Sequence, residues 1–405
     1  MRQYSFVRMP TAWLLAIPLA LAIYGCSVNA SDTGAGGAAI SLKHQAALRA
    51  SLKAAGTNRD SLVKALEMLP AGQRPGMKYL LENMPRSDLQ KLTGAFLAND
   101  VSQSYAAMKA APWRKEVPRA IFFQYVLPYA NLDEIRESWR TRLAALCRPL
   151  VAHCRTATQA ALVLNKAVFP LLNVRYSADK RPKPNQSPSE SIAAHYASCS
   201  GLSILLVDAC RSVGVPARIV GTPMWAIHRG DANGNNAGNH TWVEFWDGQW
   251  HILGASEVSP PDKTWFLANA SLAYGARNIL IDGIYAHRIY AATFKRNAGK
   301  NGDWFPMVWN LQDRTVYAED VTSDYFHRVR VKVRLVNSHN MPTTANLILR
   351  RKGRLIADLP VDGKSVLWLS AGGHYSATMR LKGKKWQQAI VIPSVPPFQV
   401  VVTLH

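Results

Sequence analysis

The sequence predicts an α+β protein, because three stretches of the 405-residue chain differ in hydrophobic period. In residues 41–158 apolar side chains recur every three or four positions, which is typical of helices. Residues 159–290 mix helical and strand patterns and are expected to form the core. In residues 326–405 charged and apolar side chains alternate and turn residues recur, which predicts a small antiparallel β-sandwich. Residues 291–325 are expected to connect the last two regions.

The first 25 residues have the pattern of an export signal. Arg2 and Arg8 give the segment a positive start, and residues 12–23 form an apolar run without a charged side chain. A helix needs roughly 20 apolar residues to cross a membrane, so this run indicates a signal segment rather than an anchor. We therefore expect residues 1–25 to direct export.

The end of this segment resembles the lipobox of bacterial lipoproteins, in which a small residue precedes the cysteine that receives the lipid. Gly25 precedes Cys26, and Ser27 follows where an aspartate would indicate inner-membrane retention. The resemblance implies that Cys26 is lipidated and anchors the protein to the outer membrane of a bacterial cell envelope, facing the periplasm. Residues 26–40, rich in Ser, Gly and Ala, would form a flexible tether. The alternative is an ordinary cleaved signal that leaves Cys26 as a free thiol.

Two cysteines lie near the end of the helical region. Cys147 and Cys154 are seven positions apart. In an oxidising compartment such a pair could form a local disulfide. The alternative is two buried thiols, because sequence spacing does not fix the Cα separation that a disulfide requires.

The chain is strongly basic, with a net charge of +22 at neutral pH. Residues 326–405 alone contain seven arginines and six lysines against two acidic residues, a net charge of +11. This balance favours an anionic partner. An exported protein meets little nucleic acid, so we expect no nucleic-acid partner and consider an anionic polymer of the envelope. The alternative is a solvated basic face without a partner.

One cysteine lies where a predicted helix begins. After Cys199, apolar residues recur at helical spacing up to Val213, and Gly214 ends the pattern. A helix N-terminus carries positive partial charge and free backbone N–H groups, which favour a thiolate and can bind an oxyanion. Cys199 is therefore a candidate nucleophile, and the alternative is a buried structural thiol. Cys210 falls on the apolar face of the same helix and is expected to pack in the core.

A predicted β-hairpin follows this helix. Two strand-like segments flank Asp247-Gly248, a dipeptide typical of tight hairpin turns. His240 begins the first strand, from which its ring could reach Cys199. A catalytic thiol needs such a base, which also protonates the leaving amine. Taken alone, His240 would be a polar residue at a strand end; its pairing with Cys199 makes it the candidate base.

These segments resemble the transglutaminase-like superfamily, whose core is a papain-like fold with a Cys-His-Asp triad. The matching segments are Ser-Cys-Ser-Gly-Leu (198–202), Gly-Val-Pro-Ala-Arg (214–218) and Asn-His-Thr-Trp-Val-Glu-Phe-Trp (239–246). The resemblance covers residues 160–270. It implies a transglutaminase-like core with Cys199 as the nucleophile and His240 as the general base.

The third residue of the triad departs from the family pattern. The family places an aspartate on the strand after the hairpin, and Gly254 occupies that position here. Glycine cannot orient an imidazole, and the nearest acidic residue is Glu257. Glu257 is therefore the candidate third member, and the alternative is a surface acid beside a proline turn. A triad without its orienting residue often retains activity, since that residue chiefly fixes the tautomer and stabilises the imidazolium.

No metal or cofactor is predicted. A Gly/Asn-rich loop has the first ligand spacing of a calcium loop from Asp231, but Asn236 and Trp242 stand where such a loop needs glycine and glutamate. A plain turn-rich loop is the better interpretation.

Together these features predict thiol chemistry on amide bonds of a protein or peptide. Cys199 would attack the carbonyl carbon, His240 would move the proton, and water or an amine would resolve the thioester. Hydrolysis by a protease or amidase is favoured over acyl transfer, because bacterial members of the superfamily include both kinds of hydrolase. Two alternatives remain: a catalytically degenerate domain that binds an envelope polymer or protein, and a scaffold protein in which Cys199 has no role.

Overall fold

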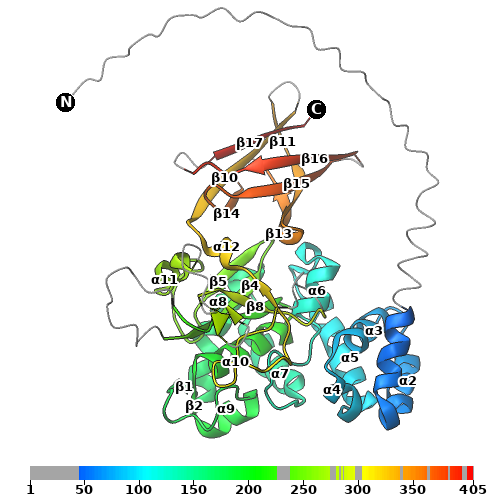
Figure 1. Cartoon of the computed structure of the whole chain (residues 1–405). Helices are drawn as coiled ribbons and strands as arrows, with labels where there is room; N and C mark the ends of the chain where they lie inside the picture. Colours follow the sequence, from blue (N-terminus) through cyan, green and yellow to red (C-terminus); the bar gives the residue numbers. More distant parts are fainter. Residues whose placement is uncertain are drawn as a thin grey trace, which may run out of the picture. The chain divides into compact units, whose positions relative to one another are not determined.

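The computed structural model describes residues 45–225, 238–273, 280–281, 284–285, 287–296, 303–337, 341–362, 365–381, 384–394 and 399–404. They form a helical N-terminal region, a core of helices around an antiparallel sheet, and a C-terminal region of strands, so the α+β prediction is confirmed (Figure 1). In this part of the chain no helix is long and apolar enough to cross a membrane. The predicted signal, Cys26 and the predicted tether lie outside the described residues.

The N-terminal region is a layer of short helices with a core of its own. Its elements are η1 (Gly56–Asn58), α2 (Arg59–Met68), α3 (Arg74–Asn83), α4 (Arg86–Lys91), α5 (Gly94–Ala110), η2 (Arg114–Glu116), α6 (Arg119–Tyr125) and α7 (Trp139–Leu150). The apolar faces of α2 to α6 bury Leu80, Leu81 and Leu97, whereas the apolar face of α7 packs into the core around α8 and α10. Thr93 caps α5 by accepting a hydrogen bond from the backbone N–H of Phe96 at 3.2 Å.

The two cysteines near the end of this region are separate thiols. Cys147 lies in α7, Cys154 follows that helix, and both are buried. Burial raises the pKa of the Cys147 thiol to about 12, so this group stays protonated and unreactive at neutral pH. The sequence left a disulfide and two buried thiols as alternatives, and the structure contains the two buried thiols.

The core contains a five-stranded antiparallel sheet covered by helices. Its elements are α8 (Ala157–Leu172), β1 (Arg175–Tyr176), α9 (Pro188–Ala194), β2 (Tyr196–Ala197), α10 (Cys199–Ser212), β3 (Ala217–Thr222), β4 (His240–Trp246), β5 (Trp250–Leu253), α11 (Leu267–Leu272), β6 (Leu280–Ile281), β7 (Ile284–Tyr285), β8 (Tyr290–Ala292) and β9 (Ala318–Asp320). The strand order is β5-β4-β3-β8-β9. The segment 291–325, predicted as a connector, therefore completes the core sheet, because β8 pairs with β3 and β9 pairs with β8.

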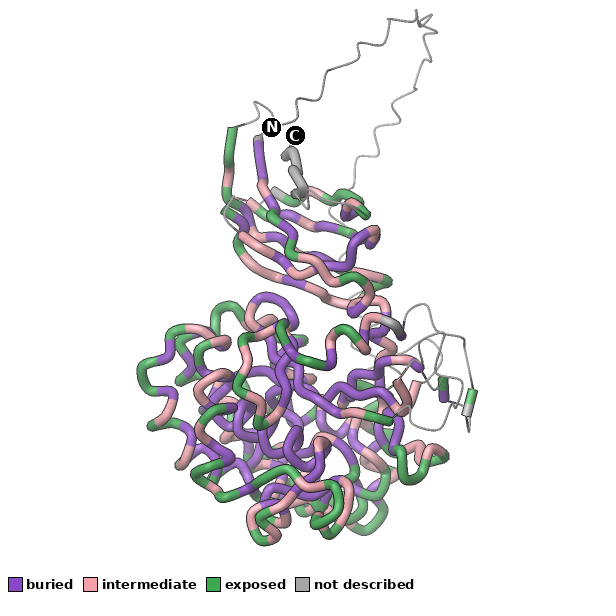
Figure 2. Tube along the Cα trace, turned by 90° about the vertical axis from the view of Figure 1, so that its left-hand side faces the viewer, coloured by how far each residue is buried: buried purple, intermediate pink, exposed green. Residues whose placement is uncertain are grey.

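Helix α10 is surrounded by protein along almost its whole length. It packs between β3 and β4 on one side and α7 and α8 on the other. Every residue from Ser200 to Ser212 is buried, so Cys199 is the only residue of this helix that reaches the surface. Figure 2 shows this concentration of buried segments in the core. The helix thus holds its first residue on a rigid support.

A buried ion pair joins the two central strands. Arg218 on β3 lies opposite Glu244 on β4, and Nη2 of Arg218 is 2.6 Å from Oε2 of Glu244. Both side chains are almost fully buried. The hydroxyl of Tyr325 donates to Oε1 of Glu244 at 2.5 Å, and the Trp250 ring lies 3.9 Å from the Arg218 guanidinium. The carboxylate is therefore satisfied only while both partners are present.

We expect Arg218→Gln to lower the free energy of unfolding by about 3–5 kcal/mol, because it leaves the Glu244 carboxylate buried without its cation. Urea denaturation followed by tryptophan fluorescence measures this loss. Arg59→Gln is the matched control, since Arg59 pairs with the exposed Asp60 and its loss should cost less than about 1 kcal/mol. Equal losses in the two variants would contradict the expected role of burial.

The C-terminal strands form two sheets packed face to face. After α12 (Thr322–Tyr325) come β10 (Arg328–Asn337), β11 (Pro342–Thr343), β12 (Ala345–Arg351), β13 (Arg354–Val361), β14 (Val366–Ser370), β15 (His374–Leu381), β16 (Lys384–Val391) and β17 (Gln399–Leu404). One sheet is β11-β10-β14 with β17 also on β10, and the other is β13-β12-β15-β16. The predicted sandwich is antiparallel throughout, whereas β17 runs parallel to β10. Because β16 and β17 belong to different sheets, no hairpin forces β17 into the antiparallel direction.

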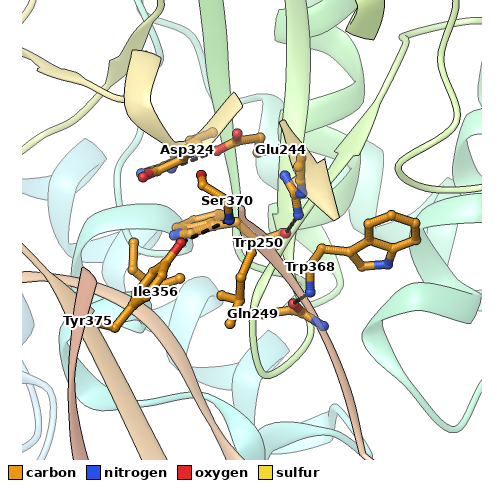
Figure 3. Close-up of a pocket in the computed structure, with 11 residues that line it drawn as sticks. Glu244, Gln249, Trp250, Asp324, Ile356, Trp368, Ser370 and Tyr375 are labelled. Carbon is orange, nitrogen blue, oxygen red and sulfur yellow. Dashed lines mark hydrogen bonds and ion pairs between the residues drawn. The ribbon is translucent and has the colours of Figure 1, made fainter. Parts of the chain in front are cut away.

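The β4–β5 turn of the core contacts the sandwich. The carbonyl of Gly248 accepts from the N–H of Asp358 at 2.7 Å. The Gln249 side chain accepts from the N–H of Trp368 at 2.9 Å (Figure 3). It also donates to the Val366 carbonyl at 3.2 Å. Gly248 has a positive φ of 73°, as the predicted hairpin turn requires.

Candidate functional site

Cys199 begins α10, where the sequence places it. The preceding residue, Ser198, has an extended backbone, but its hydroxyl donates to the Pro184 carbonyl at 3.1 Å and does not cap the helix. The first N–H groups of α10 therefore lack a side-chain partner and are free to bind an oxyanion. Cys199 is partly exposed, whereas the other cysteines in the described part of the chain are buried.

Tyr176 flanks the approach to Cys199. The short strands β1 and β2 pair in parallel, with Tyr176 opposite Ala197, two residues before Cys199. The Tyr176 side chain is 62% exposed. Partial burial and, next, the negative charge of the Cys199 thiolate raise the pKa of Tyr176. An aromatic surface therefore lies beside the candidate nucleophile.

His240 begins β4, opposite Thr222 on β3. Two hydrogen bonds join the start of α10 to Thr241, the next residue of β4. The Ser200 hydroxyl donates to Oγ1 of Thr241 at 3.1 Å, and the Ser203 hydroxyl donates to the Thr241 carbonyl at 3.4 Å. Because the first of these bonds joins the residues that directly follow Cys199 and His240, the structure brings both candidate residues to the same end of the helix and sheet.

Aromatic rings surround the imidazole of His240. The distances between ring centroids are 4.9 Å to Phe266, 5.1 Å to Trp265, 5.9 Å to Trp242 and 6.1 Å to Trp225. Burial in this cluster lowers the pKa of His240 to about 4. Its Nε2 is buried without a hydrogen-bond partner in the described structure. The imidazole is therefore neutral at pH 7 and can accept a proton, but no hydrogen bond to Nε2 fixes its tautomer.

The lowered pKa of His240 predicts a loss of stability in acid. Between pH 6.5 and 4 the unfolded chain binds a proton at this residue and the folded chain does not, so the free energy of unfolding falls as pH falls. The full effect is about 3 kcal/mol. Urea denaturation at pH 7 and pH 4 should show a larger loss for the wild type than for His240→Gln, which has no titrating ring. An equal pH dependence in both proteins would contradict the burial of a neutral imidazole.

Glu257 lies in the turn after β5, with its carboxylate over Gly254. A Cβ atom built on Gly254 would lie 2.1 Å from Oε2 of Glu257, so the carboxylate fills the space where a side chain at position 254 would begin. Oε1 of Glu257 accepts from Nε1 of Trp265 at 2.9 Å. Partial burial raises the pKa of Glu257, and the bond from Trp265 opposes that shift. No described hydrogen bond joins Glu257 to His240; the two residues are linked through the Trp265 ring.

Asn165 of α8 holds this turn. Its Nδ2 donates to the carbonyls of Gly254 at 2.9 Å and Glu257 at 2.7 Å. Its Oδ1 accepts from the N–H of Ser256 at 2.8 Å, and Ser256 has a positive φ of 65°. The Asn165 side chain is buried. Asn165 was not predicted from the sequence. The sequence gives one indication of its role: a polar amide side chain stands at a position where the helical period predicts a buried apolar residue.

A small pocket opens beside His240. Helix α10 and strands β3 and β4 contribute Ser200, Gly221, Thr222, His240 and Thr241, and a later segment contributes Phe305, Pro306, Val308 and Trp309. Its rim includes Trp309, which is 40% exposed. None of the described residues that line the pocket is an Asp, Glu, Lys or Arg, so this lining suits an uncharged group such as an amide and its apolar neighbours.

The described residues contain no group of three or more His, Cys, Asp or Glu side chains that could hold a metal ion. Asp231 and Asn236, the residues compared with a calcium loop, lie outside the described residues.

The similarity of this chain to individual known proteins is low. No curated protein matches the chain. One solved structure with similarity is a presumptive cysteine protease from Cytophaga hutchinsonii, at 20% identity and a TM-score of 0.26, covering 33% of this chain and 43% of that chain. Another is red sea bream transglutaminase, at 10% identity and a TM-score of 0.31, covering 71% of this chain and 66% of that chain. This chain thus spans less than two thirds of either protein.

The family match covers the segment that carries the candidate site. Residues 144–270 match the model of the transglutaminase-like superfamily, and this range includes Cys199, His240 and Gly254. The resemblance seen in the sequence is confirmed: the chain carries a transglutaminase-like domain at residues 144–270.

Proposed function

We propose that the protein is a thiol-dependent hydrolase or acyltransferase that acts on amide bonds, with Cys199 as the nucleophile and His240 as the general base. One observation carries the proposal. The partly exposed thiol in the described structure lies at the uncapped N-terminus of a buried helix, and hydrogen bonds join the start of this helix to the strand that His240 begins. A nucleophile, a neutral base and free N–H groups are the parts that acyl transfer requires.

The reaction would proceed through a thioester. The Cys199 sulfur attacks the carbonyl carbon while His240 takes the thiol proton, and the first N–H groups of α10 stabilise the negative oxygen. His240 then protonates the amine nitrogen as the C–N bond breaks. In the second half, His240 takes a proton from water, the hydroxide attacks the thioester, and the thiol is regenerated with release of the acid. An amine in place of water would give acyl transfer.

Glu257 is the third residue of the proposed site. Its carboxylate fills the space above the glycine that stands at the family's aspartate position. It holds Trp265 by a hydrogen bond, and Trp265 contacts the imidazole. We assign Glu257 the role of a positioning residue that acts on His240 through Trp265.

The same proposal locates the activity in a bacterial cell envelope, with a protein or peptide as substrate. It rests on the export pattern of residues 1–25 and on the lipobox-like sequence that ends at Cys26. The lipid on Cys26 would attach the enzyme to the outer membrane.

Thiol labelling tests the Cys–His pair directly. Residues 27–405 are treated with iodoacetamide from about pH 5 to 9, a range that brackets the titration of a free thiol, and peptide mass spectrometry reports each cysteine. We expect Cys199 to be labelled faster than a free thiol near neutral pH, where the neutral imidazole of His240 accepts the thiol proton, and more slowly in His240→Ala. The matched control is His374→Ala, which removes an exposed histidine of the sandwich and should leave the rate unchanged. Labelling no faster than that of a free thiol, and indifferent to His240, would contradict the proposal.

A second candidate function is a binding domain that keeps the fold without catalysis. Gly254 at the position where the family resemblance implies an aspartate favours it, and so does Nε2 of His240, which has no hydrogen-bond partner among the described residues. This function predicts that Cys199→Ala leaves binding of its partner unchanged.

A further inference from the structure

Three strands of the sandwich present a polar outer face. In β12, β15 and β16 alternate residues lie on the same face, and the register aligns them in rows across the sheet. The rows are Arg350–Ser376–Ala389, Ile348–Thr378–Gln387 and Asn346–Arg380–Lys385. The residues between them, such as Leu347, Leu349 and Met379, point inward and are buried. The outer face is hollowed into an open groove lined by Ile348, Arg350, Ser376, Ala377, Thr378, Arg380, Lys385, Gln387, Gln388 and Ala389. We call it the basic groove.

The cations of the basic groove are not neutralised by the described residues. Arg350, Arg380 and Lys385 are exposed, and none forms an ion pair with a described carboxylate. The nearby acid on β13, Asp358, accepts a hydrogen bond from Nδ2 of Asn346 at 2.7 Å. The positive charge of this face is therefore available to an anionic ligand.

The spacing of the cations points to a particular ligand chemistry. Arg350 lies two rows away from Arg380 and Lys385, which corresponds to about 14 Å along the strands. Between them the middle row presents the hydroxyl of Thr378 and the amide of Gln387, and the hydroxyl of Ser376 lies in the row of Arg350. A ligand that fits has anionic groups at separated points with hydrogen-bonding groups between them.

We propose that the basic groove binds an acidic polysaccharide, a chain of sugar rings that carry carboxylates and free hydroxyls. The carboxylates would pair with the arginines and the lysine, and the hydroxyls would bond with the polar middle row. Single-stranded nucleic acid is disfavoured, because its binding sites stack bases on aromatic rings and none of the described residues that line this groove is aromatic. The groove belongs to the sandwich, so the proposal does not depend on the thiol chemistry.

Binding to polygalacturonate tests the proposal. Isothermal titration of the full chain measures affinity at low and high salt, with the double variant Arg380→Gln/Lys385→Gln beside the wild type. We expect the wild type to bind at low salt, to weaken as salt rises, and to lose roughly tenfold in affinity in the double variant. Arg350→Gln tests the other end of the groove and should also weaken binding.

The matched control is Lys53→Gln/Lys64→Gln, which removes two exposed lysines of the helical region and the same net charge. It should bind polygalacturonate as the wild type does. Equal losses in the two double variants would show that net charge, and not the groove, is responsible, and would overturn the proposal. Tighter binding of oligo-dT, equal binding of uncharged dextran, or no binding of polygalacturonate at low salt would each overturn it as well. Unchanged melting curves would confirm that the variants are folded.

Discussion

Cys199→Ala is expected to reduce amide hydrolysis at least about 1000-fold, because it removes the atom that attacks the carbonyl. No other described cysteine can replace it, since Cys147, Cys154 and Cys210 are buried. Burial also raises the pKa of Cys210 far above that of an ordinary thiol, so it forms no thiolate at neutral pH. Release of amines from a peptide library, measured at enzyme excess, would report the loss.

Cys210→Ala is the matched control for this prediction, because it deletes a thiol from the same helix. We expect it to lower stability by leaving a small cavity among the apolar side chains around α10, and to keep the hydrolysis rate per folded molecule. If both Cys199→Ala and Cys210→Ala kept the wild-type rate, neither thiol of α10 would carry the reaction, and the binding-domain function would be favoured.

The local parts of the site could be predicted from the sequence because each depends on neighbouring residues. The apolar period between Cys199 and Gly214 predicts where α10 begins, and Asp247-Gly248 predicts the hairpin that His240 opens. Both features follow from backbone preferences and side-chain spacing. For the same reason the alternation of charged and apolar residues in β10 predicts a strand with one buried face.

The remaining parts depend on contacts between distant residues. Asn165 reaches the 254–257 turn across about 90 positions of sequence, and no local pattern pairs them. The addition of β8 and β9 to the core sheet and the parallel direction of β17 are also long-range pairings. The Glu257 carboxylate lies over Gly254 because of the shape of the 254–257 turn, which Asn165 holds. The sequence could therefore identify Glu257 as the nearest acid, but not where its carboxylate lies.

Exchanging the carboxylate between positions 254 and 257 should separate its chemical role from its packing. Glu257→Ala is expected to lower hydrolysis about 10- to 100-fold, because Trp265 loses its acceptor and the His240 ring loses a support. Gly254→Asp alone should also be impaired. Its Cβ would overlap the Glu257 carboxylate, and two carboxylates would share one buried space. Both single variants are measured for hydrolysis and for melting temperature.

The double variant Gly254→Asp/Glu257→Ala is the decisive measurement. The new aspartate has room to enter the space that Glu257 vacates, and the resemblance to the family implies an aspartate at this position. If the carboxylate supports the imidazole, hydrolysis should recover toward the wild-type rate, and the two substitutions should be strongly non-additive. Asn165 and its hydrogen bonds are unchanged in this variant, so the turn keeps its shape. A folded double variant no more active than Glu257→Ala would show that an aspartate at position 254 does not replace Glu257, and would contradict the support of the imidazole by a carboxylate in this space.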